Sequence, residues 1–172
     1  MDRVACPWLI RKFIDLNAEF LFVPGDQVEA KAAELGAVPF DIDGCELGHH
    51  GEDVSFDSIL KKYGLYDPAL MLLGEVVRAA DSQPSKPHPA GEGLRWVAFG
   101  FSALGLSDHD ILDREFIVYD ALYAECQRRV VPVERHAEHP RLPSFEAQYG
   151  APADGAGAGR YGQMPLAGVA TS

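Results

Sequence analysis

The sequence has few basic residues, few cysteines and no long apolar run. Among its 172 residues, 15 are Lys or Arg and 26 are Asp or Glu, which gives a formal net charge of −11. Because phosphate binding requires a basic surface, we do not expect independent nucleic-acid binding. The three cysteines are an odd number and form no CxxC pair, so neither a disulfide framework nor a local metal-binding motif is indicated.

Signals for export and for membrane insertion are also missing. The N-terminus lacks the basic segment followed by an apolar stretch that marks a signal peptide, and no apolar segment is long enough to span a bilayer. We therefore expect a cytoplasmic protein without a membrane partner. Since 47% of the residues are hydrophobic, the chain can form a core, and its length is that of one ordinary domain.

The pattern along the chain predicts a mainly helical α/β domain over residues 1–128. Apolar residues recur at helical spacing in about five or six segments, and short strand patterns indicate a small sheet. One strand is predicted at Glu19–Val23, and the apolar segment Leu94–Leu104 predicts a buried helix. Residues 129–172 are rich in Gly, Ala and Pro without periodicity, so we expect a partly disordered tail there.

A hairpin is predicted at Phe40–Leu47. The segment alternates apolar and polar residues around Asp43-Gly44, a strong signal for a two-residue hairpin turn. If the alternation continues, His49 faces the core and His50 faces the opposite side.

The N-terminal segment carries a chemical signal. Pro7 suits the first position of a helix, which places Cys6 at or beside the N-cap. Free backbone N–H groups and the helix dipole lower the pKa of a thiol at that position. Because Arg3 and Arg11 add positive charge nearby, the segment predicts either a reactive thiol or a small oxyanion site. The alternative is that Cys6 is a buried packing residue.

Two further carboxylates are placed toward the core by their helical patterns. Asp81 continues the apolar stripe of the helix that Asp67 and Pro68 begin. Asp120 lies just off the apolar stripe of the last helix, next to Tyr119. Buried polar groups of this kind need partners.

Short motifs follow one another in a fixed order through most of the chain. They are Asp2–Asp15, Ala18–Pro24, Pro39–Ile42, Glu46–Gly51, Ser55–Asp57, Tyr63–Leu65, Asp67–Leu70, Val76–Asp81 and Tyr119–Tyr123. Together they resemble the chromate-resistance (ChrB-type) C-terminal domain family, over roughly residues 1–127. The resemblance implies an accessory or sensing role in chromate resistance. It also implies that the DNA-reading part of any regulator of this family lies outside this chain.

A metal ion is the first ligand hypothesis. Zinc or iron would satisfy an imidazole, two carboxylates and a thiol together, with Tyr119 and His50 beside the ligands. A metal-dependent enzyme of unassigned reaction is therefore the alternative function. The expected ligands are His49, Asp81, Asp120 and Cys6.

An oxyanion bound without metal is the second hypothesis, with Arg3, Cys6, Arg11 and His49 around the anion. A third reading is that the polar residues are structural: His49 bonded to a backbone carbonyl, Asp81 capping a loop, and Asp120 paired with Arg3 or Arg11. In that case the domain acts through a protein partner or as a homo-oligomer.

Overall fold

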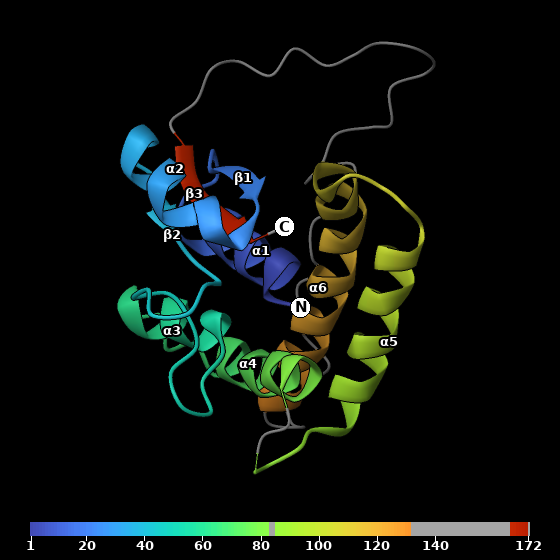
Figure 1. The fold of residues 1–172 in the computed structure, drawn as a ribbon. Helices are drawn as coiled ribbons and strands as arrows, with labels where there is room; N and C mark the ends of the chain where they lie inside the picture. The colour runs from blue at the N-terminus through green and yellow to red at the C-terminus, as the bar shows by residue number, and fades with distance from the viewer. Residues whose placement is uncertain (83–84, 132–165, 172) are drawn as a thin grey trace.

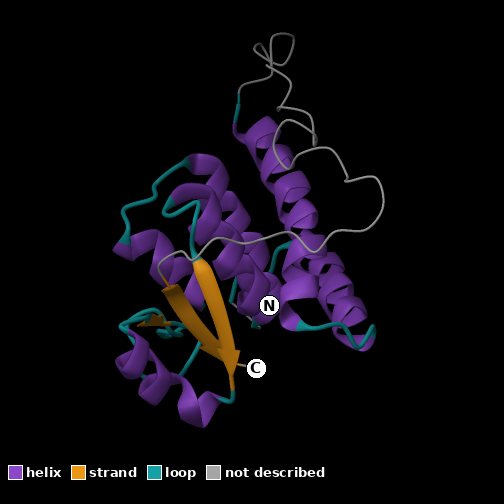
Figure 2. Cartoon of the chain, turned by 90° about the horizontal axis from the view of Figure 1, so that it is seen from above, coloured by secondary structure: helices purple, strands orange, loops and turns teal. Residues whose placement is uncertain are grey.

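The computed structural model describes residues 1–82, 85–131 and 166–171, which form a mainly helical domain (Figures 1 and 2). Within these residues there are six α-helices, one short 3-10 helix and three strands, so the mainly helical class is confirmed. In chain order the elements are α1 (Asp2–Phe13), β1 (Glu19–Val23), η1 (Gly25–Gln27), α2 (Val28–Leu35), β2 (Val38–Pro39), α3 (Ser55–Lys62), α4 (Pro68–Asp81), α5 (Pro89–Ala103), α6 (Asp108–Val130) and β3 (Leu166–Thr171).

Helix α1 is the centre of the core, between the sheet and the helices α4 and α6 (Figure 1). Trp8 is 1% exposed, and its ring centroid lies 6.0 Å from that of Tyr119 and 5.8 Å from that of Tyr123, both on α6. The Trp8 indole N–H also donates to Asp120 at 3.0 Å. Aromatic packing and one buried hydrogen bond therefore fix α1 against α6.

The prediction that the first helix begins at Pro7 is wrong. The helix begins five residues earlier, at Asp2, and the backbone N–H groups of Val4 and Ala5 donate to the carbonyl of Met1 in its first turn. Pro7 lies inside the helix, where its ring nitrogen cannot donate to the carbonyl of Arg3. Tertiary packing of the surrounding apolar residues outweighs this one lost hydrogen bond.

The sheet is parallel and has the strand order β1-β3-β2. Strand β1 has the bounds predicted from the sequence, and Gly36 ends α2 in a left-handed conformation with φ of 65°. Strand β3 lies within the segment predicted to be a tail, and that part of the prediction is wrong. The composition of residues 129–172, taken as a whole, gave no strand signal, although one short segment ending in Val169-Ala170-Thr171 forms a strand. Residues 132–165 of the predicted tail lie outside the described residues.

The hairpin predicted at Phe40–Leu47 does not form. Phe40 and Leu47 are joined by a single isolated bridge, and both are buried in the core, at 1% and 3% exposed. Asp41 has a φ of 60°, which breaks the alternation of an extended strand. The segment is therefore an irregular loop, and the faces assigned to its side chains by alternation are not those observed.

Helix α5 is not the buried helix that its composition predicted. Trp96 and Phe99 are 73% and 68% exposed, whereas Gly91 and Leu94 are buried. A Cβ added to Gly91 would lie 2.6 Å from the Cβ of Ala79 on α4, so the two helices meet at a contact that only glycine fits. None of the helices in the described residues combines the length and apolar character needed to span a membrane.

We predict that Gly91→Ala destabilises the protein by about 1–3 kcal/mol, because the added methyl group overpacks the contact between α4 and α5. The matched control is Gly100→Ala on the same helix, where an added Cβ meets nothing within 4 Å. Alanine there should stabilise the helix by about 0.5–1 kcal/mol. Urea unfolding of the two variants measures both effects, and equal stabilities would contradict the close contact.

Candidate metal centre

Three carboxylates from separate segments surround the imidazole of His49. His49 Nε2 lies 3.2 Å from Asp2 Oδ2, 3.5 Å from Asp81 Oδ2 and 3.9 Å from Asp41 Oδ1. Asp2 begins α1 and Asp81 ends α4, whereas Asp41 and His49 belong to the loop between β2 and α3. We call these four residues the carboxylate–histidine cluster.

Asp2 is the most deeply buried member of the cluster, at 1% exposed. Its Oδ2 atom accepts a hydrogen bond from the backbone N–H of Ser55 at 2.7 Å and also faces His49. Its Oδ1 atom is buried and has no hydrogen-bond partner among the described residues. A carboxylate oxygen buried without a partner is costly, so it is an exception that requires an explanation.

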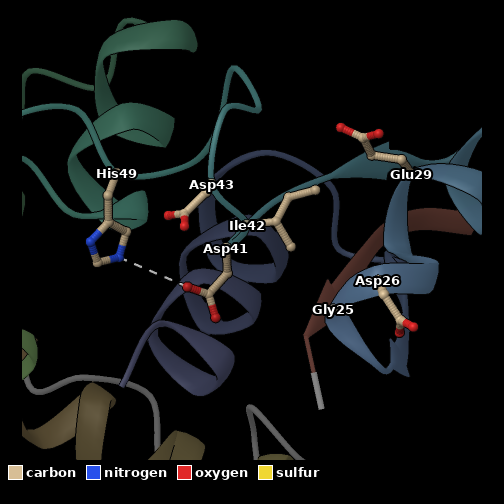
Figure 3. Close-up of a pocket in the computed structure, with 7 residues that line it drawn as sticks. All are labelled: Gly25, Asp26, Glu29, Asp41, Ile42, Asp43 and His49. Atoms are coloured by element: carbon tan, nitrogen blue, oxygen red, sulfur yellow. Dashed lines mark ion pairs between the residues drawn. The ribbon is translucent and has the colours of Figure 1, made fainter.

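Asp41 is held in a strained conformation at the same place. Within the described part of the chain it is the one non-glycine residue with a positive φ. Its carboxylate faces His49, as the dashed line in Figure 3 shows. Strained backbone of this kind clusters at functional sites, because the surrounding structure holds a side chain in a required position.

The charges of the cluster shift the pKa of its members. Burial raises the pKa of the Asp41 carboxyl from 3.8 to about 6, with a further contribution from the charge of Asp2. Burial also raises the pKa of Asp81 above its ordinary value, again with Asp2 adding to it. The hydrogen bond with Asp2 raises the pKa of His49 from 6.5 to about 9, so the imidazole holds its proton at neutral pH. The N-terminal ammonium lies 3.4 Å from Asp81 Oδ1.

The donor atoms of Asp2, Asp41 and His49 could hold a metal ion, because they all lie within 4.8 Å of one another. In a tetrahedral site with bonds of about 2.1 Å, neighbouring ligand atoms lie roughly 3.4 Å apart. Binding would therefore draw the more distant of these atoms together by up to about 1.4 Å. Asp81 offers an additional carboxylate oxygen, Oδ2, at 3.5 Å from His49 Nε2.

A hollow of about 580 Å³ opens beside Asp41 and His49. Figure 3 shows Asp26 and Glu29 on the side of α2, across from His49. Among the residues that the structure describes, no lysine or arginine lines this hollow, so the approach to the cluster is acidic. The residues that line it are Gly25, Asp26, Glu29, Asp41, Ile42, Asp43 and His49.

Of the residues proposed from the sequence, the structure brings His49 and Asp81 together. Asp2 and Asp41, which complete the cluster, were missed. Both lie within the motifs that carry the family resemblance, beside residues that were considered. Asp2 was passed over because the helix was expected to begin at Pro7, and Asp41 because strand alternation placed it away from His49.

Cys6 does not have the environment predicted for it. It is 0% exposed inside α1, and burial raises the pKa of its thiol well above the ordinary value, with Asp2 and Asp41 adding to the shift. The predicted lowered pKa is therefore wrong, because Cys6 is inside the helix and not at its N-terminus. The contacts identify Cys6 as a packing residue.

The basic residues of α1 make contacts outside the cluster. Arg3 Nη1 donates to Asp108 at 3.0 Å. Arg11 Nε donates to the carbonyl of Ala18, and its guanidinium lies over the rings of two phenylalanines, Phe20 and Phe116. The structure does not gather Arg3, Arg11, Cys6 and His49 around one hollow.

The remaining proposed residues also have other contacts. Asp120 accepts hydrogen bonds from Trp8 and from Lys12 Nζ at 2.8 Å, so Lys12 is an ion-pair partner of Asp120. Tyr119 is buried and its hydroxyl donates to the sulfur of Met1 at 3.3 Å. His50 Nε2 lies 3.1 Å from the carbonyl oxygen of Glu46, on the exposed side of the loop.

Together the fold and the cluster define a mainly helical domain with a partly buried carboxylate–histidine centre. The family model described as "ChrB, C-terminal domain" matches residues 1–126, and the chain belongs to this family. The chain is also 36% identical over 124 residues to Protein ChrB of Cupriavidus metallidurans, a match that covers 72% of this chain. The match spans 37% of the length of that relative. No solved structure matches the chain significantly.

We predict that the metal-free protein loses stability as the pH rises from about 6.5 to about 9. The raised pKa of His49 stabilises the folded state fully below pH 6.5, and this contribution is lost as the pH rises through about 9. Since the side chain is 41% exposed, we expect about 1 kcal/mol after solvent screening. Urea unfolding of protein treated with a chelator, on both sides of this pH range, measures the effect.

His49→Gln should remove this pH dependence, whereas His50→Gln on the exposed side of the same loop should leave it unchanged. If His49→Gln loses as much stability over the range as the wild type, the electrostatic role of His49 is wrong.

Proposed function

We propose that this domain binds a divalent transition-metal ion at the carboxylate–histidine cluster, and that metal binding is the basis of an accessory or sensing role in chromate resistance. The link with chromate resistance is inferred from the family, and the metal ion is inferred from the residues of the cluster. The chain's own residues supply binding and charge, and no reaction is required for this function.

The unpartnered Oδ1 atom of Asp2 is the observation that carries the proposal. Buried charged oxygens are found paired or bound to metal ions. The other oxygen of the same carboxylate already contacts Ser55 and His49, so Oδ1 is left for a ligand that enters the cluster. A bound cation would remove the cost of burying this atom.

The donor set favours a transition metal over magnesium or calcium. Carboxylate oxygens bind all of these ions, but imidazole nitrogen selects for ions such as zinc and ferrous iron. His49 must lose its proton to become a ligand, and the hydrogen bond with Asp2 holds that proton. Metal binding should therefore release a proton and become tighter as the pH rises.

The charge around the cluster supports a cation in preference to an oxyanion. The hollow that leads to it is lined by Asp26, Glu29, Asp41 and Asp43. A region of negative charge attracts cations and repels a dianion such as chromate. Arg3 and Arg11, the residues expected to hold an oxyanion, are engaged with Asp108 and Ala18.

A metal-dependent enzyme is the second candidate function. It is supported by the hollow beside Asp41 and His49, whose volume of about 580 Å³ is within the range of small-molecule pockets, roughly 300–1,000 Å³. A substrate there would lie next to a metal held by the cluster. Turnover that depends on the metal would favour this candidate over a sensing role.

We predict that the protein binds about one equivalent of zinc or ferrous iron, and that Asp41→Asn and His49→Gln each weaken binding by about tenfold or more. Asparagine tolerates the left-handed conformation of residue 41, so Asp41→Asn changes the ligand without changing the backbone. Elemental analysis of protein purified without chelators, followed by calorimetric titration, measures stoichiometry and affinity.

Asp43→Asn is the matched control, because Asp43 lines the same hollow but does not belong to the cluster. It should change the affinity by less than about threefold. Addition of metal should raise the Tm of the wild type and not that of His49→Gln. Absence of metal from the folded protein, with no binding on titration, would overturn the proposal.

A further inference from the structure

A second hollow, of about 370 Å³, lies between the end of α4 and helix α5. It shares Asp81 with the carboxylate–histidine cluster but is lined otherwise by different residues. Its lining includes a guanidinium, a hydroxyl and an aromatic ring, from Arg95, Ser102 and Phe99. No residue of this hollow except Asp81 has a role in the proposed metal site.

Arg95 is fixed in place by the end of helix α4. Its Nε donates to the carbonyl of Ala80 at 2.7 Å, and its Nη2 donates to the carbonyls of Ala79 and Ser82, both at 2.9 Å. These bonds satisfy carbonyls that a helix end leaves without donors, and they hold the guanidinium plane in one orientation.

The third nitrogen of Arg95 is left for another ligand. Among the described residues, Nη1 has one ionic neighbour, the Glu92 carboxylate at 3.9 Å, which is beyond hydrogen-bond distance. Glu92 is 66% exposed, so this contact is weak. A guanidinium edge that is already oriented and still has free donors is suited to a carboxylate or a similar anion.

Apart from Arg95, the hollow is lined partly by apolar side chains and partly by Asp81, Ser82 and Ser102. Phe99 is 68% exposed, and Ala80 and Ala98 lie beside it. The volume is within the range of pockets for small organic molecules and is much larger than a single inorganic anion needs. A ligand that fits would have one anionic end and an apolar body.

We propose that this hollow binds a small organic carboxylate, with its carboxylate on Nη1 of Arg95 and its apolar body against Phe99 and Ala98. Exposed Phe99 is then a binding residue, and the ligand covers part of the apolar face of α5. Binding of the carboxylate does not require a metal ion in the carboxylate–histidine cluster.

Asp81 belongs both to the second hollow and to the carboxylate–histidine cluster, so it can couple the two sites, and this coupling rests on the proposed function. The Asp81 carboxylate repels an anion on Arg95, and a metal ion in the cluster reduces the local negative charge. Metal binding should therefore tighten carboxylate binding, and by linkage the carboxylate should tighten metal binding by the same factor.

The test uses 4-fluorobenzoate as the probe and fluorine NMR of the full chain as the readout. We expect saturable binding of 4-fluorobenzoate and binding of neutral 4-fluorobenzamide that is weaker by about tenfold, because the amide lacks the charge that Arg95 recognises. Equal binding of the two compounds would overturn the role of Arg95. Binding of sulfate in place of 4-fluorobenzoate would overturn the apolar half of the site.

Ala98→Met is the variant that blocks the hollow without altering Arg95 and its contacts with α4. It should abolish binding of 4-fluorobenzoate, whereas Gly100→Ala, where an added Cβ meets nothing within 4 Å, should leave it unchanged. Arg95→Met should also abolish binding of 4-fluorobenzoate, but it lowers the stability of the protein because the bonds of Arg95 to the end of α4 are lost. Ala98→Met is therefore the decisive variant. Retained binding in Ala98→Met, or no binding by the wild type at millimolar probe, would overturn the proposal.

The two proposals fail separately. His49→Gln removes the metal and should bind 4-fluorobenzoate as the metal-free wild type does, whereas Ala98→Met removes the probe and should leave metal stoichiometry intact. If the probe binds but its affinity does not change with metal, the site stands and the coupling through Asp81 is wrong.

Discussion

The buried carboxylate of Asp2 is the constraint on which the arrangement of this domain depends. Its Oδ2 atom connects three segments. Asp2 begins α1, and Oδ2 accepts the N–H of Ser55 at the start of α3 and faces His49 in the loop between β2 and α3. A carboxylate at 1% exposure can be accommodated only if its surroundings supply donors or positive charge. The loop that carries His49 and Asp41 is therefore held by this carboxylate as well as by the apolar contacts of Phe40 and Leu47.

The position of Asp2 is fixed in turn by the packing of α1. The helix is buried on several sides, and its residues Ala5, Cys6 and Leu9 have no exposed surface. Trp8 and Lys12 both bond to Asp120 on α6, which limits rotation of α1 about its own axis. The cluster is thus supported by rigid elements on the side of Asp2 and Asp81, and by a strained loop on the side of Asp41.

Local patterns predicted the elements better than they predicted the site. Strand β1, the end of α2 at Gly36, and the caps of α4 by Asp67 and of α6 by Ser107 follow from turn and capping chemistry, which depends on a few adjacent residues. The meeting of Asp2, Asp41 and Asp81 depends on contacts between distant segments, which no local period encodes. Asp81 was found because its helical pattern pointed inward, and His49 was found through a strand alternation that the structure does not show. Asp41 was missed because it required a left-handed φ that no sequence rule assigned to it.

Amino-acid composition gave a wrong prediction at two places in the chain, for a related reason. The apolar composition of α5 indicated burial, but only the face with Gly91 and Leu94 meets α4, and Trp96 and Phe99 remain exposed. The Gly, Ala and Pro content of the last residues indicated a tail, but a short strand needs only one segment with an edge to pair with. Composition averages over faces and segments, and both errors arise from that averaging.

A second buried carboxylate in this protein, that of Asp57, forms a structural ion pair. Asp57 is 4% exposed, and both of its oxygens bond to Arg78, at 2.7 and 2.9 Å, while Oδ2 also accepts the N–H of Val54. The bond with Asp57 raises the pKa of Arg78, as expected when one carboxylate meets one guanidinium.

The carboxylate–histidine cluster departs from this pattern. Three carboxylates meet at one imidazole, burial raises the pKa of Asp41 and Asp81, and one oxygen of Asp2 has no partner among the described residues. A purely structural site would be more stable with fewer carboxylates, since each added like charge raises the cost of the others. Asp57 and Arg78 demonstrate that this fold can satisfy a buried carboxylate completely, and the excess of carboxylates around Asp2 is therefore the basis on which we propose a bound cation.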